Sequence, residues 1–294
     1  MPRAALLSIH ARVEGTEPTT WEDRSLVQLW GPRYSVFVVP ARDLAVFSLG
    51  TLPDDAKGRR RAEDLAARLS DLLGVESMDY ASAGRALGVH PNSLRYAAAT
   101  GTVLIRWDGA RRPTVWTVEP PAVDPFEALL ELARRFLHIY GPATPQAFAT
   151  WAGIRPRQGV AAFEVLRKSL TPVRTPIGEA WILTRDEPAF RAVPSPAASA
   201  RLLPSGDPYF LLWGVDRELL IRDSTRRREL WTSRVWPGAV LASGEIVGTW
   251  RRAGATVTVR PWGRLPRATR AGVETEAEAL PLGLQDQIRV GWES

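Results

Sequence analysis

The chain has 294 residues, of which 45% are hydrophobic and 24% charged, so it is long enough for two or three folded domains and its composition excludes a disordered protein. It contains no cysteine, which excludes disulfides and thiolate metal sites, and its histidines (His10, His90 and His138) are too scattered to predict a zinc site. No apolar run of about 18 residues and no signal-peptide pattern occurs. We therefore expect a cytoplasmic protein with no membrane partner, no metal and no cofactor.

The positive charge is concentrated in one part of the chain. The net charge is +6 and the isoelectric point is about 10.2, which suits a polyanionic partner. Eleven arginines stand against three acids between Arg222 and Arg270, so this tract is a candidate phosphate-binding surface. Only Lys57 and Lys168 are lysines, a bias typical of GC-rich coding, so a solvated face without function remains the alternative.

A repeated pattern organises the middle of the chain. In the first copy, a short helix over about 82–87 ends at Gly88, and Pro91 opens a second helix that runs to about Ala99. A β-prone run over 103–105, a turn at Asp108-Gly109 and a returning run over 115–118 predict a two-stranded wing.

The second copy has the same order of elements. Thr144 is the predicted N-cap of its first helix, Gly153 ends that helix, and Pro156 opens the next. A hairpin over 173–184 follows. Ahead of the copy, Asp124 starts an amphipathic helix whose apolar residues share one face: Phe126, Leu129, Leu130, Ala133, Phe136 and Leu137.

The two ends of the chain differ from this repeat. The first 60 residues resemble a cropped copy, with helices predicted over 4–13 and 21–30 and a strand over 34–39. From residue 201 onward the pattern predicts an antiparallel meander with strands over 209–213, 218–221, 238–242, 245–250 and 255–260.

The predicted fold class is therefore α+β, with tandem winged-helix domains (a helix-turn-helix plus a β-wing) followed by a small antiparallel β-domain. The predicted boundaries are 1–60 for the cropped first winged helix, 61–121 for the second, 122–200 for the third and 201–294 for the β-domain.

Candidate DNA contacts follow from the helix-turn-helix reading, because the second helix enters the major groove and its first residues face the base edges. The alternative for each is an ordinary exposed helix start or loop. Arg111 and Arg112 lie at the first wing tip, and Arg251 and Arg252 lie at a later hairpin end, where they could clamp phosphate beside a buried Trp250. The helix-start candidates are His90, Asn92, Ser93 and Arg95 in the first copy and Arg155, Arg157 and Gln158 in the second.

Five stretches resemble a known family, the winged-helix DNA glycosylases of the AlkZ and YcaQ type, which unhook interstrand crosslinks and excise alkylated purines. In chain order they are PRAALLSIHARVEG, SLVQLWGPRYSVFVVPARDL, YGPATPQAFATWAGI, RLLPSGDPYFLL and WPGAVLASGEIVGTWRR. The first is most similar to an actinobacterial branch described as winged-helix DNA-binding proteins. The resemblance implies three winged helices and a C-terminal β-domain that enclose a DNA channel.

The family's catalytic motif does not carry over. Its Gln-hydrophobic-Gln or Gln-hydrophobic-Asp motif, which holds the attacking water, lies just before the residues that match Pro2 to Ala5, at or before Met1. In the family pattern FDPYL, moreover, Gly206 replaces the Phe. The catalytic residues are therefore unassigned, and His10, Glu14 and Asp207 are the nearest polar substitutes.

Three functions remain open on the sequence. The first is a DNA-binding protein of the glycosylase superfamily in repair of alkylated or crosslinked DNA, which is catalytic only if the motif lies upstream. The second is a non-catalytic DNA binder or regulator, and the third is a protein-interaction scaffold. For the first two we expect a nucleoid-associated monomer whose partner is double-stranded DNA.

Overall fold

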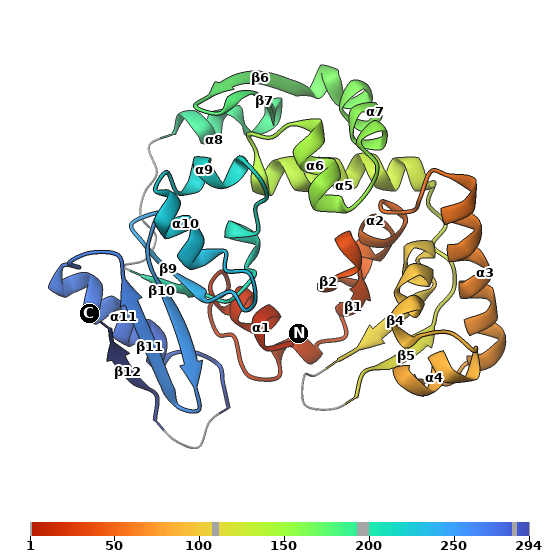
Figure 1. Cartoon of the computed structure of the whole chain (residues 1–294), viewed down its shortest axis with the longest axis horizontal. Helices are drawn as coiled ribbons and strands as arrows, with labels where there is room; N and C mark the ends of the chain where they lie inside the picture. Colours follow the sequence, from red (N-terminus) through yellow and green to blue (C-terminus); the bar gives the residue numbers. More distant parts are fainter. Residues whose placement is uncertain (1, 108–111, 193–199, 284–286, 294) are drawn as a thin grey trace. The chain divides into compact units, whose positions relative to one another are not determined.

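The computed structural model describes residues 2–107, 112–192, 200–283 and 287–293, and its architecture is α+β, as predicted (Figure 1). Backbone contacts group the chain into two compact units. We call Glu22–Phe190 the large unit. We call Arg3–Trp21 together with Arg191–Ser294 the sheet unit.

The large unit begins with a β-hairpin. Its two strands pair antiparallel from Leu26 opposite Pro40 to Trp30 opposite Val36. The helix predicted over 21–30 is therefore wrong: this β-prone run instead pairs with the valine-rich run that follows it. The elements are η1 (Thr20–Glu22), β1 (Leu26–Trp30), η2 (Pro32–Tyr34), β2 (Val36–Pro40), η3 (Ala41–Asp43) and α2 (Leu44–Leu49).

The next segment contains the first repeat copy. The first helix ends as predicted at Gly88, whose φ of 66° is left-handed, and Pro91 opens the second helix. This second helix is 3₁₀ throughout, and a short extra strand makes a three-stranded sheet of order β3-β5-β4. The elements are α3 (Ala56–Leu73), β3 (Met78–Asp79), α4 (Tyr80–Ala86), η4 (Pro91–Thr100), β4 (Val103–Arg106) and β5 (Thr114–Thr117).

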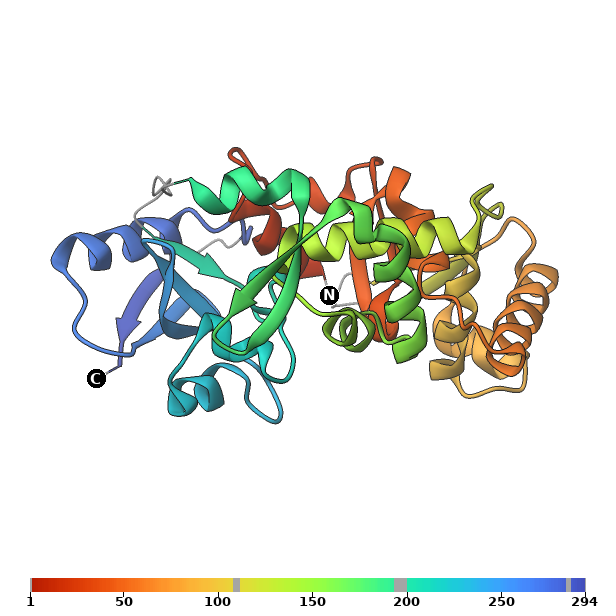
Figure 2. The ribbon, with the colours of Figure 1, turned by 90° about the horizontal axis from the view of Figure 1, so that it is seen from above.

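The third segment contains the second copy, ending in the β6–β7 hairpin (Figures 1 and 2). Asp124 and Thr144 cap their helices, because their side chains accept backbone N–H groups of the first turn. The predicted apolar face is buried except for Phe126, which is 41% exposed. The elements are α5 (Pro125–Tyr140), α6 (Pro145–Ala152), α7 (Pro156–Leu166), η5 (Arg167–Ser169), β6 (Leu170–Thr175), β7 (Gly178–Leu183), η6 (Thr184–Asp186) and α8 (Glu187–Arg191).

The sheet unit is built on a five-stranded sheet of order β12-β11-β10-β9-β8. The predicted meander is antiparallel from β8 to β11, but β12 runs parallel to β11, so the sheet is mixed. Gly238 lies under the Trp250 indole, where a Cβ atom would lie 2.2 Å from Nε1. The strands are β8 (Arg201–Leu203), β9 (Gly238–Ala242), β10 (Glu245–Ala253), β11 (Thr256–Pro261) and β12 (Arg289–Trp292).

Helices cover this sheet, and the first comes from the other end of the sequence. Leu7 of α1 shares a buried cluster with Leu202, Val240 and Val273, so α1 belongs to the sheet unit rather than to the hairpin at 26–40. The strands predicted over 209–213 and 218–221 are wrong, because such short apolar runs do not distinguish strand from helix. The helices are α1 (Pro2–His10), η7 (Pro208–Phe210), α9 (Asp216–Leu220), α10 (Ser224–Leu230) and α11 (Arg267–Glu278).

The described residues include neither a helix that could cross a membrane nor a cluster of side chains that could hold a metal ion. Each helix in this part of the chain is too short or too polar to cross a membrane. Within the same residues, no group of three or more His, Asp and Glu side chains is arranged to hold a metal ion.

Candidate nucleic-acid interface

The start of η4 presents two exposed polar side chains. His90 is the N-cap residue, and its Nδ1 accepts the Asn92 backbone N–H at 3.2 Å. The Asn92 Oδ1 accepts the Tyr80 hydroxyl. The Asn92 amide nitrogen has no hydrogen-bond partner among the described residues, so it is available to an external acceptor such as a base edge.

Farther along η4 the candidates are less accessible. Ser93 is half-buried. The Arg95 guanidinium carbon lies 5.5 Å from the ring centroids of both Tyr34 and Tyr96, which themselves form an edge-to-face pair at 4.9 Å. Arg95 also lowers the pKa of Tyr96, an effect that burial opposes. Arg95 therefore holds aromatic side chains together inside the large unit.

The first wing tip is only partly described. Arg111 lies outside the described residues, together with the turn predicted at Asp108-Gly109. Arg112 is exposed directly after it. Its charge adds a small contribution to the lowered pKa of Asp79, which arises mainly from the backbone N–H of Ser82.

The start of α7 carries two arginines that are already paired. Arg155 Nη2 lies 3.0 Å from Asp55 Oδ2, and the Arg157 Nε donates to Asp54 Oδ2. The hydrogen bond from Arg157 is the largest influence on the pKa of Asp54 and lowers it, whereas burial opposes the shift. The sequence pattern alone does not point to either acid. They lie about 100 residues upstream, and only the consecutive Asp54-Asp55 before α3 could have drawn attention to them.

Gln158 serves the fold. It is 9% exposed, its Oε1 accepts the Arg155 backbone N–H at 3.2 Å, and its Nε2 donates to the Leu52 carbonyl at 3.2 Å. Both ends of the amide are thus engaged within the large unit.

Arg251 and Arg252 do not form one clamp. Successive residues of a strand point to opposite faces of a sheet, so these two neighbours on β10 diverge. Arg251 Nη2 donates to the Val235 carbonyl at 2.9 Å, and Arg252 Nη1 donates to the Gly254 carbonyl in the adjoining turn. Trp250 is buried as expected, and its indole N–H donates to the Leu203 carbonyl at 2.8 Å.

The arginine tract is mostly unneutralised. Arg226 and Arg227 form ion pairs with Asp223 and Glu218. Eight of the eleven arginines have no carboxylate oxygen within 4.0 Å among the described residues. They are Arg222, Arg228, Arg234, Arg251, Arg260, Arg264, Arg267 and Arg270.

A buried carboxylate anchors the N-terminal helix within the sheet unit. Asp207 is 1% exposed, and the two Arg12 Nη atoms donate to its two oxygens at 2.7 and 2.9 Å. The Ser8 hydroxyl donates to the same carboxylate at 2.6 Å, and the Tyr209 backbone N–H donates at 2.9 Å. Every strong acceptor position of Asp207 is therefore used by the fold, which leaves it unsuited to activate water.

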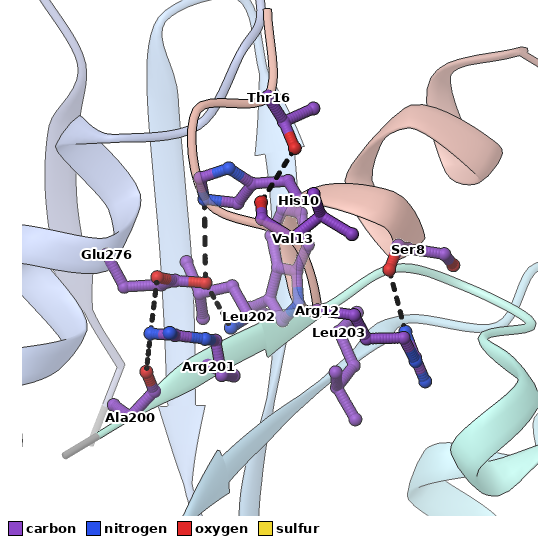
Figure 3. A network of polar contacts seen from close by, with 11 residues as sticks. Ser8, His10, Arg12, Val13, Thr16, Ala200, Arg201, Leu202, Leu203 and Glu276 are labelled. Atoms are coloured by element: carbon purple, nitrogen blue, oxygen red, sulfur yellow. Dashed lines mark hydrogen bonds and ion pairs between the residues drawn. The ribbon is translucent and has the colours of Figure 1, made fainter. Parts of the chain in front are cut away.

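Glu276 has a similar role on α11 (Figure 3). It is 6% exposed and accepts Arg201 Nη1 at 3.2 Å and the Leu202 backbone N–H at 3.3 Å. His10 Nε2 lies 3.8 Å from Glu276 Oε1. Of the three polar substitutes considered for catalysis, only Glu14 is exposed to solvent.

Comparison with known proteins agrees with this architecture. The family model for AlkZ-like DNA glycosylases matches residues 1–281. A curated relative, the interstrand DNA cross-link repair glycosylase of Streptomyces sahachiroi, is 28% identical over 161 residues, which are 52% of this chain and 42% of the relative. The match thus spans less than half of that relative's length.

The fold of a solved protein is also similar. The DNA glycosylase AlkZ of Streptomyces sahachiroi superposes with a TM-score of 0.76 over 99% of this chain and 90% of its own, at 18% sequence identity. On the strength of the family model, which covers nearly the whole sequence, the chain belongs to the AlkZ-like DNA glycosylase family.

Proposed function

We propose that this chain is a monomeric, nucleoid-associated protein that binds double-stranded DNA without a metal or cofactor and acts as a glycosylase in repair of alkylated or crosslinked DNA. The observation that carries DNA binding is the set of eight arginines without a carboxylate partner in the described part of the sheet unit. The glycosylase assignment rests on family membership and on the curated relative, whose name gives interstrand crosslink repair as its activity.

We propose winged-helix domains for the three segments predicted from the sequence, 1–60, 61–121 and 122–200, with the first beginning at Glu22 and the third ending at Phe190 because Arg3–Trp21 and the residues after Phe190 group with the sheet unit. The order helix, turn, helix and hairpin in 80–117 and 145–183 supports this assignment. Arg155 and Arg157 belong to the proposed DNA contacts, because DNA phosphates can compete with Asp54 and Asp55 for their guanidinium groups. Three candidates are not included. Arg95 lies against two tyrosine rings, and Gln158 is buried with both ends of its amide bonded. Arg252 is on the core-facing side of β10, opposite Val257. The proposed contacts are His90, Asn92, Ser93, Arg111, Arg112, Arg155, Arg157 and Arg251.

Duplex binding is tested by fluorescence anisotropy with a labelled 20–25 base-pair duplex at several salt concentrations. We expect the logarithm of the binding constant to fall linearly with the logarithm of the salt concentration, with a slope of about −0.9 for each phosphate contacted. Absence of binding at low salt, or affinity that does not change with salt, would remove the DNA proposal and favour a protein scaffold.

Base excision is tested on duplexes that carry an alkylated purine or an interstrand crosslink. Release of the free modified base, detected by mass spectrometry, is the expected result, with an unmodified duplex as the control. If the chain binds these duplexes tightly yet releases no base, the glycosylase part of the proposal fails while DNA binding stands.

A second function, DNA binding without excision, is favoured by one observation. Asp207 and Glu276 are both buried and are held by Arg12 and Arg201, so neither of these two acids is available to position a water molecule, and Glu14 is an exposed acid that remains after α1. The excision assay decides between the two functions.

A further inference from the structure

One face of the β10–β11 pair is polar, whereas the other belongs to the core. Trp250, Val257 and Val259 point into the buried cluster of the sheet unit. The alternating residues therefore face the opposite side. They are Thr249, Arg251, Thr258 and Arg260, and the register places Thr249 opposite Arg260 and Arg251 opposite Thr258.

These four residues line a pocket of about 440 Å³. The two arginines occupy diagonal positions, whose backbones lie about 7–8 Å apart in an antiparallel pair, so their long side chains can reach a common point. The other lining residues are Glu229 of α10, Thr232 and Pro237 of the loop after it, Trp250 of β10, and Glu293 directly after β12.

The polar groups on this face keep donors for a ligand, although Arg251 Nη2 is engaged by the Val235 carbonyl. Neither Arg251 nor Arg260 has a carboxylate oxygen within 4.0 Å among the described residues. In the same part of the chain, the hydroxyls of Thr249 and Thr258 have no hydrogen-bond partner, although Thr249 is 7% exposed. Both hydroxyl oxygens remain accessible to solvent, so each can donate to a ligand.

The two acids shape what the pocket can accept. The Glu229 carboxylate accepts the Trp262 indole N–H at 3.0 Å, and Glu293 is exposed at the rim. The formal charges of the lining cancel, so net charge does not attract an anion here. Binding instead depends on donors that converge from four side chains, a geometry that fits one tetrahedral oxyanion better than an extended polyanion.

We propose that this pocket binds one backbone phosphodiester of duplex DNA, with Arg251 and Arg260 as the charged donors and Thr249 and Thr258 as hydroxyl donors. This inference rests on the proposed DNA binding. The pair that binds phosphate is then Arg251 with Arg260, nine residues apart, instead of the Arg251–Arg252 clamp expected from the sequence. Arg252 is the matched control, since it is the same residue type on the same strand and lies on the other face.

The test compares the duplex affinity and salt slope of the full chain with those of Arg251→Gln, Arg260→Gln, the double variant and Arg252→Gln. We expect the double variant to bind about tenfold more weakly at 100 mM salt. Its slope should be smaller by about 0.9, the value for one phosphate, because both arginines serve the same group. Arg252→Gln should leave affinity and slope unchanged.

Removal of the acids gives a result of opposite sign. Glu229→Gln and Glu293→Gln should each tighten duplex binding a few-fold, because each relieves repulsion of a phosphate in the pocket. Inorganic phosphate at millimolar concentration should compete less well with the double variant than with the original chain.

The results of these experiments distinguish failure of the phosphate pocket from failure of the proposed DNA binding. If the original chain does not bind DNA, both fail. If it binds DNA but Arg260→Gln behaves like Arg252→Gln, or the acid replacements weaken binding, the pocket is not the phosphate site and general DNA binding stands. Circular dichroism and the melting temperature check that each variant remains folded.

Discussion

Replacing Arg12 with alanine should destabilise the sheet unit by about 2–3 kcal/mol. Removing one partner of a buried ion pair costs about 3–5 kcal/mol, because a buried charge is left uncompensated. Two features reduce this cost: the Arg12 side chain is 44% exposed, and Asp207 keeps its hydrogen bonds from Ser8 and Tyr209. At roughly 2–4 °C per kcal/mol for a chain of this size, the melting temperature should fall by roughly 4–12 °C.

The assay is thermal unfolding at pH 7, followed by circular dichroism and tryptophan fluorescence. Arg167→Ala is the control, because its ion pair with Glu164 is exposed on both sides and contributes less than about 1 kcal/mol. Asp207→Asn in the Arg12→Ala background should recover part of the loss by removing the unpaired charge. If Arg12→Ala costs no more than Arg167→Ala, or if the second replacement deepens the loss, the anchoring role of Asp207 is refuted.

Three further predictions concern the large unit. Asp54→Asn combined with Asp55→Asn should tighten duplex binding and steepen its salt dependence, because Arg155 and Arg157 then lose their ion pairs and can bind phosphate. If anisotropy titrations show no change, Arg155 and Arg157 do not contact DNA. Arg157 lowers the folded-state pKa of Asp54, so this ion pair stabilises the chain above about pH 4, and the stability is lost as the pH falls through the lowered pKa. Arg157→Gln should therefore make the melting temperature depend less on pH between pH 5 and pH 3. Gly153→Ala should lower the free energy of unfolding, measured with urea, by about 1–2 kcal/mol, because φ of Gly153 is 73° and the added Cβ atom would lie 3.0 Å from the Arg33 Cα. A loss smaller than that of an exposed Gly→Ala control would contradict this interpretation.

The repeated order of helix, turn, helix and hairpin was predictable because local backbone preferences decide it. Gly88 and Gly153 adopt left-handed conformations that favour glycine, and Pro91 and Pro156 occupy first helical positions, where proline loses no hydrogen bond. Each of these signals acts within a few residues of the chain. The 3₁₀ geometry of η4 has no comparable local signal.

The sheet unit was predicted less well because its arrangement depends on distant residues. The parallel pairing of β12 with β11 and the docking of α1 both join segments that are separated in sequence, and no turn signal links them. The segments 209–213 and 218–221 are short apolar runs, whose conformation is decided by tertiary contacts rather than by propensity.

In the candidate site, too, local features could be predicted whereas contacts between distant residues could not. Residue types and helix starts identified His90, Asn92, Arg155 and Arg157, all of which lie at the predicted positions. Their ion-pair partners could not be predicted from the sequence, because Arg157 and Asp54 are brought together only by the fold. Likewise, adjacency in sequence pointed to Arg252 as the neighbour of Arg251, whereas the strand register supplies Arg260.

The sheet unit is discontinuous, since its first helix precedes Glu22 and the rest follows Phe190. Joining the two pieces closes a loop of ~170 residues, at an entropic cost of about 4–5 kcal/mol beyond a constant. During synthesis at about 5–20 residues per second, β8 is made roughly 10–40 s after α1. Until then the apolar side of α1, including Leu6 and Leu7, is open to chaperones and to aggregation, so the order of folding is set by the last third of the chain.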